Sequence, residues 1–143
     1  MIDFWFTSGS TYTYLTVMRL PEIERTHGVR FNWRPFDRRT VSNVEGPPFT
    51  EGSSKTAYMW RDIERRAAKY GIPIRVPAPY PPKDSTLRNC VALLGLREGW
   101  GEAFVRANYV LCFQHGQEMD GVNDIAASLR QIGQDPPQVL DLA

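Results

Sequence analysis

An apolar run at the start of the chain, followed by a short turn and a helical pattern, constrains the fold more than any other feature. Residues 2–6 are almost uniformly apolar, which is typical of a strand covered on both faces. From Tyr12 to Ile23 apolar residues recur at helical spacing, and residues 29–35 alternate between apolar and polar side chains as a second strand does. This order predicts a parallel β-α-β unit with a right-handed crossover.

The turn between the first strand and the first helix, residues 7–10, reads Thr-Ser-Gly-Ser. A helix start gathers backbone N–H groups without internal partners at the positive end of the helix dipole, so it attracts negative charge. The Ser10 hydroxyl would stand at that end and is suited to donate to a phosphate, a carboxylate or a thiolate. A serine before a helix is more often an N-cap, and the pattern alone favours that role.

The remainder of the chain is predicted to be helical after a loop rich in Gly, Pro, Ser and Thr at residues 36–54. Helices are expected over 54–70, 86–98, 101–115 and 121–132, with one more from Asp135. Pro21 should kink the first helix or start a second segment. Because two parallel strands alone leave two open edges, we expect further strands after Ala143 or a second chain that supplies an edge.

Composition narrows the class of protein. A chain of 143 residues with 42% hydrophobic residues predicts one domain with a real core, and a net charge of +1 argues against nucleic acid or an anionic membrane as the main partner. There is no apolar run near 18 residues, hence no predicted membrane span. Asp3 interrupts the first apolar run and no basic leader precedes it, which favours the cytoplasm unless a leader has been removed.

Common catalytic and metal-binding signatures are absent from the sequence. There is no Gly-x-Gly-x-x-Gly, P-loop, His-Glu-x-x-His or Gly-x-Ser-x-Gly pattern. Cys90 and Cys112 have neither Cys-x-x-Cys nor zinc-ligand spacing, so buried, unreactive thiols are expected and no metal site is predicted. The remaining candidates are Ser10 and the basic and aromatic residues of the next loop and helix.

Three segments carry a resemblance to a known family. Residues 3–6 and 10–15 read Asp-Phe-Trp-Phe and Ser-Thr-Tyr-Thr-Tyr-Leu, and residues 55–67 carry a Lys-x-x-Tyr-x-x-x-Asp helix that leads to Gly-Ile-Pro at 71–73. The third segment holds Tyr80-Pro81 and Arg88-Asn89. Together they resemble the kappa-class glutathione transferases and, more closely, the bacterial 2-hydroxychromene-2-carboxylate isomerases. Thr11 departs from the proline usual at its position, a change that the first turn of a helix tolerates.

The resemblance implies an α/β, thioredoxin-like fold. The family begins with a β-α-β half, continues through a mostly helical insertion domain and closes with a β-β-α half. This implies an N-terminal part of a thioredoxin-like domain at 1–40 and a loop with an all-helical insertion domain at 41–143, with the C-terminal β-β-α half missing. The family's Val-Pro loop, which pairs with the glutathione backbone, would then be missing too.

The resemblance also implies a mechanism with glutathione as cofactor. Ser10 would be the catalytic residue, donating to the glutathione sulfur, and the helix start would favour thiolate over thiol. The thiolate would add to a small aromatic carboxylate substrate, an aromatic pyruvate, whose former double bond then rotates before glutathione is eliminated. The implied result is a cis-trans isomerisation, with homodimers as the common assembly of such relatives.

Further site residues follow from matching positions. The implied glutathione contacts are Ser10, Thr11, Tyr12, Lys55 and Asn43, and the implied substrate contacts are Tyr58, Trp60 and Arg34. Purely structural roles remain alternatives for these residues: Lys55 could be a solvated lysine, Tyr58 and Trp60 could be core residues, and Arg34 could be a surface charge. The family's Asn stands two residues before a proline step, where this chain has Glu45, with Asn43 two residues earlier.

Other functions remain alternatives. A kappa-class-like glutathione transferase would use the same residues, and a truncated or non-catalytic thioredoxin-fold fragment would fit the early end of the chain. A thiol–disulfide oxidoreductase is disfavoured because positions 10 and 13 hold serine and threonine where such enzymes carry cysteines.

Overall fold

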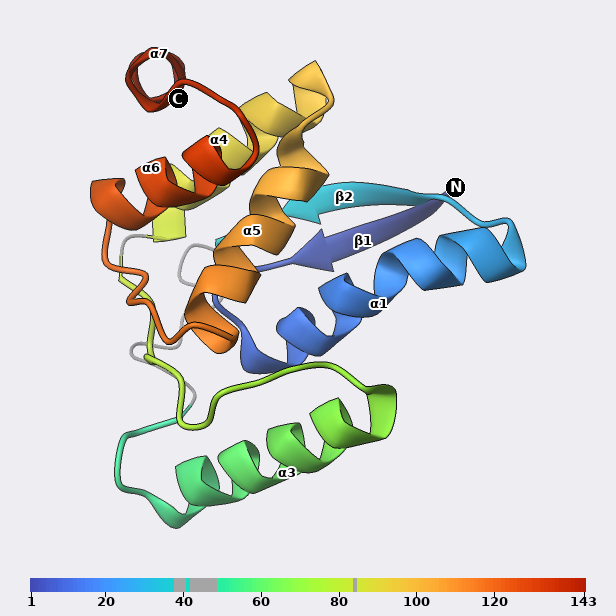
Figure 1. Ribbon diagram of the computed structural model, residues 1–143, viewed down its shortest axis with the longest axis vertical. Helices are drawn as coiled ribbons and strands as arrows, with labels where there is room; N and C mark the ends of the chain where they lie inside the picture. The colour runs from blue at the N-terminus through green and yellow to red at the C-terminus, as the bar shows by residue number, and fades with distance from the viewer. Residues whose placement is uncertain (38–40, 42–48, 84) are drawn as a thin grey trace.

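The computed structural model describes every residue except 38–40, 42–48 and 84 (Figure 1). The described part is a mixed α/β fold that is mostly helical, with one small sheet. Its elements are, in chain order, β1 (Ile2–Phe6), α1 (Thr11–His27), β2 (Phe31–Pro35), α3 (Ser54–Tyr70), α4 (Ser85–Glu98), α5 (Gly101–Phe113), α6 (Val122–Gln131) and α7 (Pro136–Leu142). Asn43 and Glu45 lie outside the described residues.

The predicted β-α-β unit is confirmed. β1 and β2 pair in parallel, with a register that runs from Ile2 opposite Phe31 to Phe6 opposite Pro35. The second strand begins two residues later than expected. Gly28 caps α1 in the left-handed conformation, with φ of 63°, and the Phe31 N–H donates to the Glu24 carboxylate at 2.9 Å before the ladder starts.

The two faces of the sheet differ. Four aromatic side chains pack on one face with ring centroids 5.3–6.4 Å apart, and they join the core: Phe4, Phe6, Phe31 and Trp33. On the other face Trp5 keeps 62% of its surface exposed, and Arg34 pairs with Asp3. The expectation that β1 is covered on both faces is therefore wrong for the described chain, because its odd-numbered positions face outward.

α1 continues through Pro21 as one helix of 17 residues, so the expectation of a second segment is wrong. Pro21 is exposed, and the loss of one backbone hydrogen bond at this proline does not divide the helix. α1 buries Tyr14, Leu15, Val17 and Leu20 in the core.

α1 and α3 run side by side in the same direction (Figure 1). The Thr11 hydroxyl at the start of α1 lies 3.5 Å from the Met59 sulfur in the first half of α3. The Arg19 guanidinium in the middle of α1 lies 3.8 Å above the ring of Tyr70 at the end of α3. The N-termini of both helices therefore lie at the same end of the molecule.

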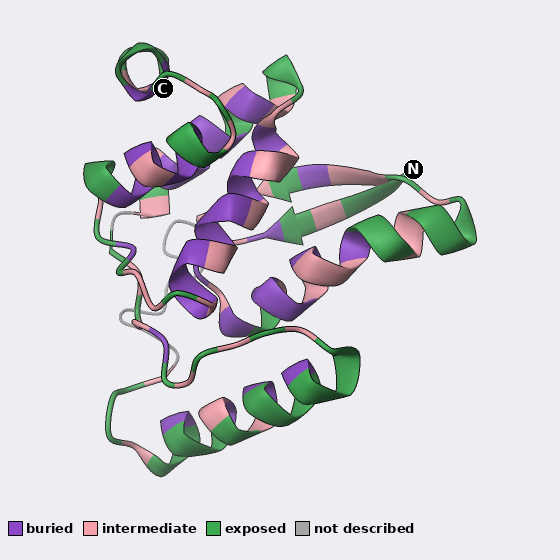
Figure 2. Cartoon of the chain, viewed as in Figure 1, coloured by how far each residue is buried: buried purple, intermediate pink, exposed green. Residues whose placement is uncertain are grey.

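The helices after α3 complete one core. α5 packs against α1, α4 and α6, and the purple residues of Figure 2 trace this buried interior from β1 to α7. The buried cluster extends from Phe6 in β1 to Val139 in α7, across the boundary expected at residue 40. None of the described helices has the length and apolar character needed to cross a bilayer.

Candidate functional site

The turn between β1 and α1 is held tightly in place. The Ser10 N–H donates to the Thr7 carbonyl at 3.4 Å, and Gly9 adopts a φ of 81°. A β-carbon on Gly9 would lie 2.3 Å from the Cγ of Pro82. Position 9 therefore favours glycine for two reasons: its backbone is left-handed, and the proline-rich segment 77–82 leaves no room for a β-carbon.

Ser10 is the N-cap of α1, as its position predicts. Its Oγ accepts a hydrogen bond from the Thr13 N–H at 3.3 Å, and its backbone is extended. A hydroxyl that accepts in this way keeps its own proton for donation, and Ser10 is only half-buried. The capping role and the donor role are thus compatible at one oxygen.

The electrostatics at this helix start favour an anion. The first turn of α1 contains no acidic residue that would neutralise the helix dipole. Its first N–H groups have no carbonyl partners within the helix. A small anion approaching the half-buried Ser10 would therefore meet partial positive charge together with a hydroxyl donor.

The side chains of Thr11 and Tyr12 are engaged with α3. Thr11 is 3% exposed and its hydroxyl points to the Met59 sulfur. The Tyr12 hydroxyl donates to the Asp62 carboxylate at 3.0 Å, and burial raises the pKa of Tyr12. Asp62 also accepts from Arg66 at 2.8 Å. If Thr11 and Tyr12 contact a cofactor as predicted, they would do so through their backbone N–H groups and not through their side chains.

The predicted residues of α3 point in different directions. Lys55 is exposed, with its ammonium 5.1 Å from the Phe49 ring. Tyr58 is 68% exposed, whereas Trp60 is half-buried and lies edge-on to Tyr80 with ring centroids 6.2 Å apart. The structure therefore separates Tyr58 from Trp60, which the sequence treats as a pair.

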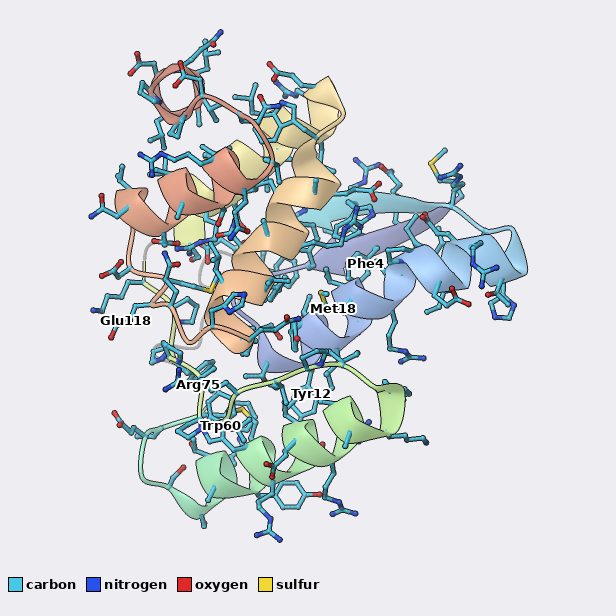
Figure 3. All side chains as sticks on the ribbon, in the orientation of Figure 1. Phe4, Tyr12, Met18, Trp60, Arg75 and Glu118 are labelled. Carbon is cyan, nitrogen blue, oxygen red and sulfur yellow. The ribbon has the colours of Figure 1, made fainter. Side chains whose placement is uncertain are left out.

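Trp60 and Tyr80 line a cavity of about 670 Å³ between the first turns of α3, the proline-rich segment and residues 118–120. Cavities of several hundred Å³ suit small organic ligands. Three carboxylates, from Glu51, Glu118 and Asp120, and one ammonium, from Lys83, also line it. Figure 3 labels Trp60 and Glu118. Trp60 is predicted from the sequence, whereas the three acidic residues are not, because they lie far apart in the chain.

Arg34 is not brought to the turn. Arg34 lies on the outward face of β2, where its Nε is 3.3 Å from the Asp3 carboxylate. That pairing offsets the positive charge predicted to attract a substrate. Asn43 falls outside the described residues, so its assignment stays a prediction.

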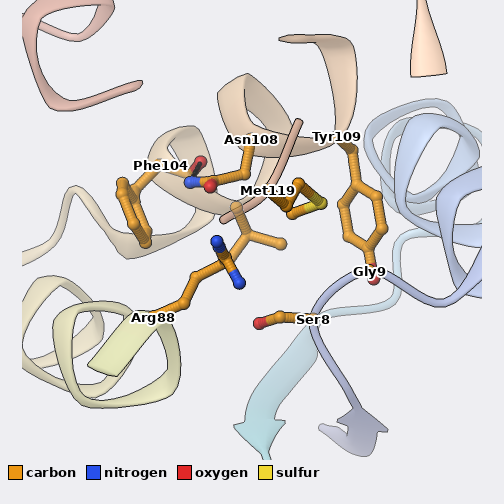
Figure 4. Close-up of a pocket in the computed structure, with 8 residues that line it drawn as sticks. Ser8, Gly9, Arg88, Phe104, Asn108, Tyr109 and Met119 are labelled. Carbon is orange, nitrogen blue, oxygen red and sulfur yellow. Dashed lines mark hydrogen bonds between the residues drawn. The ribbon is translucent and has the colours of Figure 1, made fainter. Parts of the chain in front are cut away.

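Beneath the turn lies a buried polar cluster that local sequence patterns do not predict, and Figure 4 shows three of its members, Ser8, Arg88 and Tyr109. The Ser8 hydroxyl donates to the side-chain amide oxygen of Asn89 at 2.8 Å, and the Tyr109 hydroxyl donates to the backbone carbonyl of Thr7 at 2.9 Å. Below them Arg88 pairs with Asp124 at 2.7 Å, and both side chains are almost fully buried. The sequence signal for this cluster is the polar pair Arg88 and Asn89 directly before the apolar part of α4, residues 90–96.

The cysteines lie elsewhere. Cys90 and Cys112 form no disulfide, and burial raises the pKa of the Cys112 thiol to about 12. Neither lies in the turn at residues 7–10. Among the residues that the structure describes, no three His, Cys, Asp or Glu side chains gather where they could hold a metal ion.

Comparison with known proteins fits this architecture. The family model of the DSBA-like thioredoxin domain matches residues 1–143. The chain belongs to this family. It is 32% identical to 2-hydroxychromene-2-carboxylate isomerase of Sphingobium xenophagum over 137 residues, which cover 94% of this chain and 69% of the relative. The protein of the same name from Pseudomonas putida is 31% identical over 84 residues, covering 56% of this chain and 41% of the relative.

A solved structure confirms the fold. A structure titled 2-hydroxychromene-2-carboxylate isomerase matches with a TM-score of 0.76, over 99% of this chain and 71% of that one, at 24% identity. The predicted resemblance and the predicted thioredoxin-like fold class are both confirmed.

Proposed function

We propose that this chain is a glutathione-dependent isomerase of the 2-hydroxychromene-2-carboxylate type, acting on the double bond of an aromatic pyruvate. The observation that carries the proposal is the half-buried Ser10 hydroxyl, which caps α1 and keeps a proton to donate. The homology to two proteins named as such isomerases supports the reaction class.

The start of α1 would bind glutathione through its sulfur. An ordinary thiol has a pKa of about 8.5, and a helix N-terminus lowers it. A decrease of one unit corresponds to about 1.4 kcal/mol, which is enough to make the thiolate a major species near neutral pH. Ser10 would donate to that thiolate, and the backbone N–H groups of the first turn would supply the remaining positive potential.

The thiolate would then act as the nucleophile. It adds to one carbon of the conjugated double bond, and the electron pair of that bond moves to the substrate carbonyl as an enolate. The former double bond becomes a single bond and rotates. Return of the electron pair expels the thiolate, so glutathione is regenerated and no oxidant or reductant is consumed.

The cavity beside Trp60 supports a place for the aromatic part of the substrate. Trp60 and Tyr80 offer two aromatic walls, and Gly9 of the turn packs against Pro82, next to the cavity-lining Pro81 and Lys83. Tyr58 is too exposed to serve as a wall.

Lys55 would supply a cation for a carboxylate of glutathione or substrate. It lies one helical turn before Met59, whose sulfur contacts Thr11, so its ammonium belongs to the same end of the molecule as the α1 start. Arg34 would have to leave Asp3 before it could bind a carboxylate.

An absorbance assay of 2-hydroxychromene-2-carboxylate interconversion, with and without glutathione, tests the proposal. We expect turnover only with glutathione, and loss of turnover in Ser10→Ala. Equal turnover without glutathione would contradict the proposed cofactor. Conjugates that accumulate instead of isomerised product would favour the glutathione transferase alternative, and glutathione binding without turnover would favour a non-catalytic chain.

A further inference from the structure

The hydroxyl of Tyr109 reaches from α5 into the turn that presents Ser10. It donates to the Thr7 carbonyl at 2.9 Å across a sequence separation of 102 residues, and the side chain is only 1% exposed. Burial raises the pKa of Tyr109, so the phenol stays protonated at neutral pH and can act as the donor to Thr7.

A second hydrogen bond holds the same turn from α4. Ser8 is 8% exposed and its hydroxyl donates to the side-chain amide oxygen of Asn89 at 2.8 Å. Buried hydrogen bonds between distant segments fix backbone position when each partner is itself fixed in a helix, and both Asn89 and Tyr109 are.

Packing alone does not fix the underside of the turn. A small cavity of about 10 Å³, with room for about one water molecule, lies between the turn and the helices. Figure 4 shows Ser8 and Gly9 on one side of this gap and Asn108 and Tyr109 on the other. On this side of the turn, the hydrogen bonds of Ser8 with Asn89 and of Tyr109 with Thr7 add to the restraint that Pro82 places on Gly9.

We propose that Tyr109 is a positioning residue for Ser10, with the Ser8–Asn89 hydrogen bond as its second tether. By holding the Thr7 carbonyl, the phenol keeps the peptide groups of residues 7–10 in the orientation that aims the first N–H groups of α1 at one bound anion. The inference rests on the proposed function, since that function places a thiolate beside Ser10. Tyr109 would not contact the substrate, because its side chain is buried in the core.

Tyr14 provides a matched control within the same aromatic stack. Its ring packs against Tyr109, with centroids 6.1 Å apart, and is equally buried. Its hydroxyl bonds to the Pro73 carbonyl and accepts from the Gln114 amide, so it points away from the turn. Tyr14→Phe therefore removes a comparable buried hydroxyl without releasing Thr7.

A thiol placed in the turn reports the effect without glutathione. In a Ser10→Cys chain, thiolate absorbance against pH gives the pKa of the new thiol after subtraction of the unreplaced chain, which corrects for Cys90 and Cys112. We expect this pKa below the ordinary value of about 8.5. Adding Tyr109→Phe should raise it by about half a unit, while Tyr14→Phe leaves it unchanged at a similar melting temperature.

Ser8→Ala is the second variant, in case Tyr109→Phe fails to fold, with Ser128→Ala as control because the Ser128 hydroxyl bonds only within α6. A smaller rise with Ser8→Ala and none with Ser128→Ala support the inference. An unshifted thiol pKa in Tyr109→Phe, an equal shift in Tyr14→Phe, or an ordinary pKa in Ser10→Cys alone would overturn it. Failure of the isomerase proposal would instead appear as absent glutathione binding by the unreplaced chain, whatever the thiol pKa shows.

Discussion

The two long helices α1 and α3 begin and end in the same way, yet their surroundings differ. Each has 17 residues, a serine N-cap whose hydroxyl accepts from the backbone N–H three residues on, and a glycine C-cap in the left-handed conformation. Neither carries an acidic residue in its first turn. By local sequence alone the Ser10 and Ser53 ends offer the same attraction for an anion.

The difference lies in contacts from distant parts of the chain. The hydroxyl of Ser53 bonds within its own loop and helix, to the Thr50 carbonyl at 2.8 Å and to Thr56. The turn before Ser10 is instead held by residues 81 and 102 positions away, through Ser8 and Thr7. A cap motif predicts where a helix begins, whereas long-range tethers decide which helix start is rigid enough to be a site.

The largest predicted effect concerns the buried ion pair below the turn. Asp124→Asn keeps a side-chain acceptor for the Gly121 N–H but removes the carboxylate that faces Arg88. We expect it to lower the free energy of unfolding by about 3–5 kcal/mol, measured by urea denaturation. Arg66→Gln on α3 is the control: Arg66 is exposed, so the loss of its ion pair with the partly buried Asp62 should change stability little. Similar small losses in both variants would mean that the ion pair below the α1 turn stabilises the fold no more than the ion pair on α3.

The second prediction compares the two caps directly. Ser10→Ala and Ser53→Ala should each cost about 1 kcal/mol of stability, since each removes one N-cap. Only Ser10→Ala should also lower kcat, by a factor of about 100 to 1,000, as expected for a lost donor to developing or bound negative charge. Parallel losses of kcat would mean that capping, and not donation, explains the Ser10 effect.

The third prediction tests the aromatic wall beside the α3 start. Trp60→Ala should raise KM about tenfold with a smaller change in kcat, because an aromatic contact of about 1.4 kcal/mol is lost. Tyr58→Ala, two residues earlier and 68% exposed, should leave KM within a factor of two, or about 0.4 kcal/mol. Steady-state kinetics on the two variants would show which face of α3 contacts the substrate.

The smallest effect concerns pH. Burial raises the pKa of Cys112 to about 12, above its value in the unfolded chain, so the folded state retains a proton that the unfolded state releases. Stability from this group is complete below about pH 8.5 and declines by at most about 1.4 kcal/mol per pH unit above it. Urea denaturation at pH 8 and pH 9.5 should show this decline in the parent chain and a weaker one in Cys112→Ala. Identical declines would assign the effect to other groups.

Local sequence predicts much of the fold and less of the site. α3 lies where its Ser and Gly signals place it, from Ser54 to Tyr70, and the parallel β-α-β unit follows from its periodicity. The outward face of Trp5 was not predicted, because an apolar run does not say which element covers it.

The tertiary contacts of the site residues cannot be predicted from local sequence patterns. Thr11 and Tyr12 turn towards α3, and helical spacing does not reveal which partner helix a side chain meets. Ser10 was found because a cap and a turn are local patterns. Tyr109 was not, because its role depends on a contact across most of the chain.

An NMR titration of the ¹⁵N-labelled chain with glutathione tests the central claim most directly. The account predicts the largest amide shifts at Thr11, Tyr12 and Thr13, a smaller shift near Lys55, and loss of the Thr13 shift in Ser10→Ala. Unchanged amides at residues 9–13, with glutathione at millimolar concentration, would contradict a sulfur site at the start of α1.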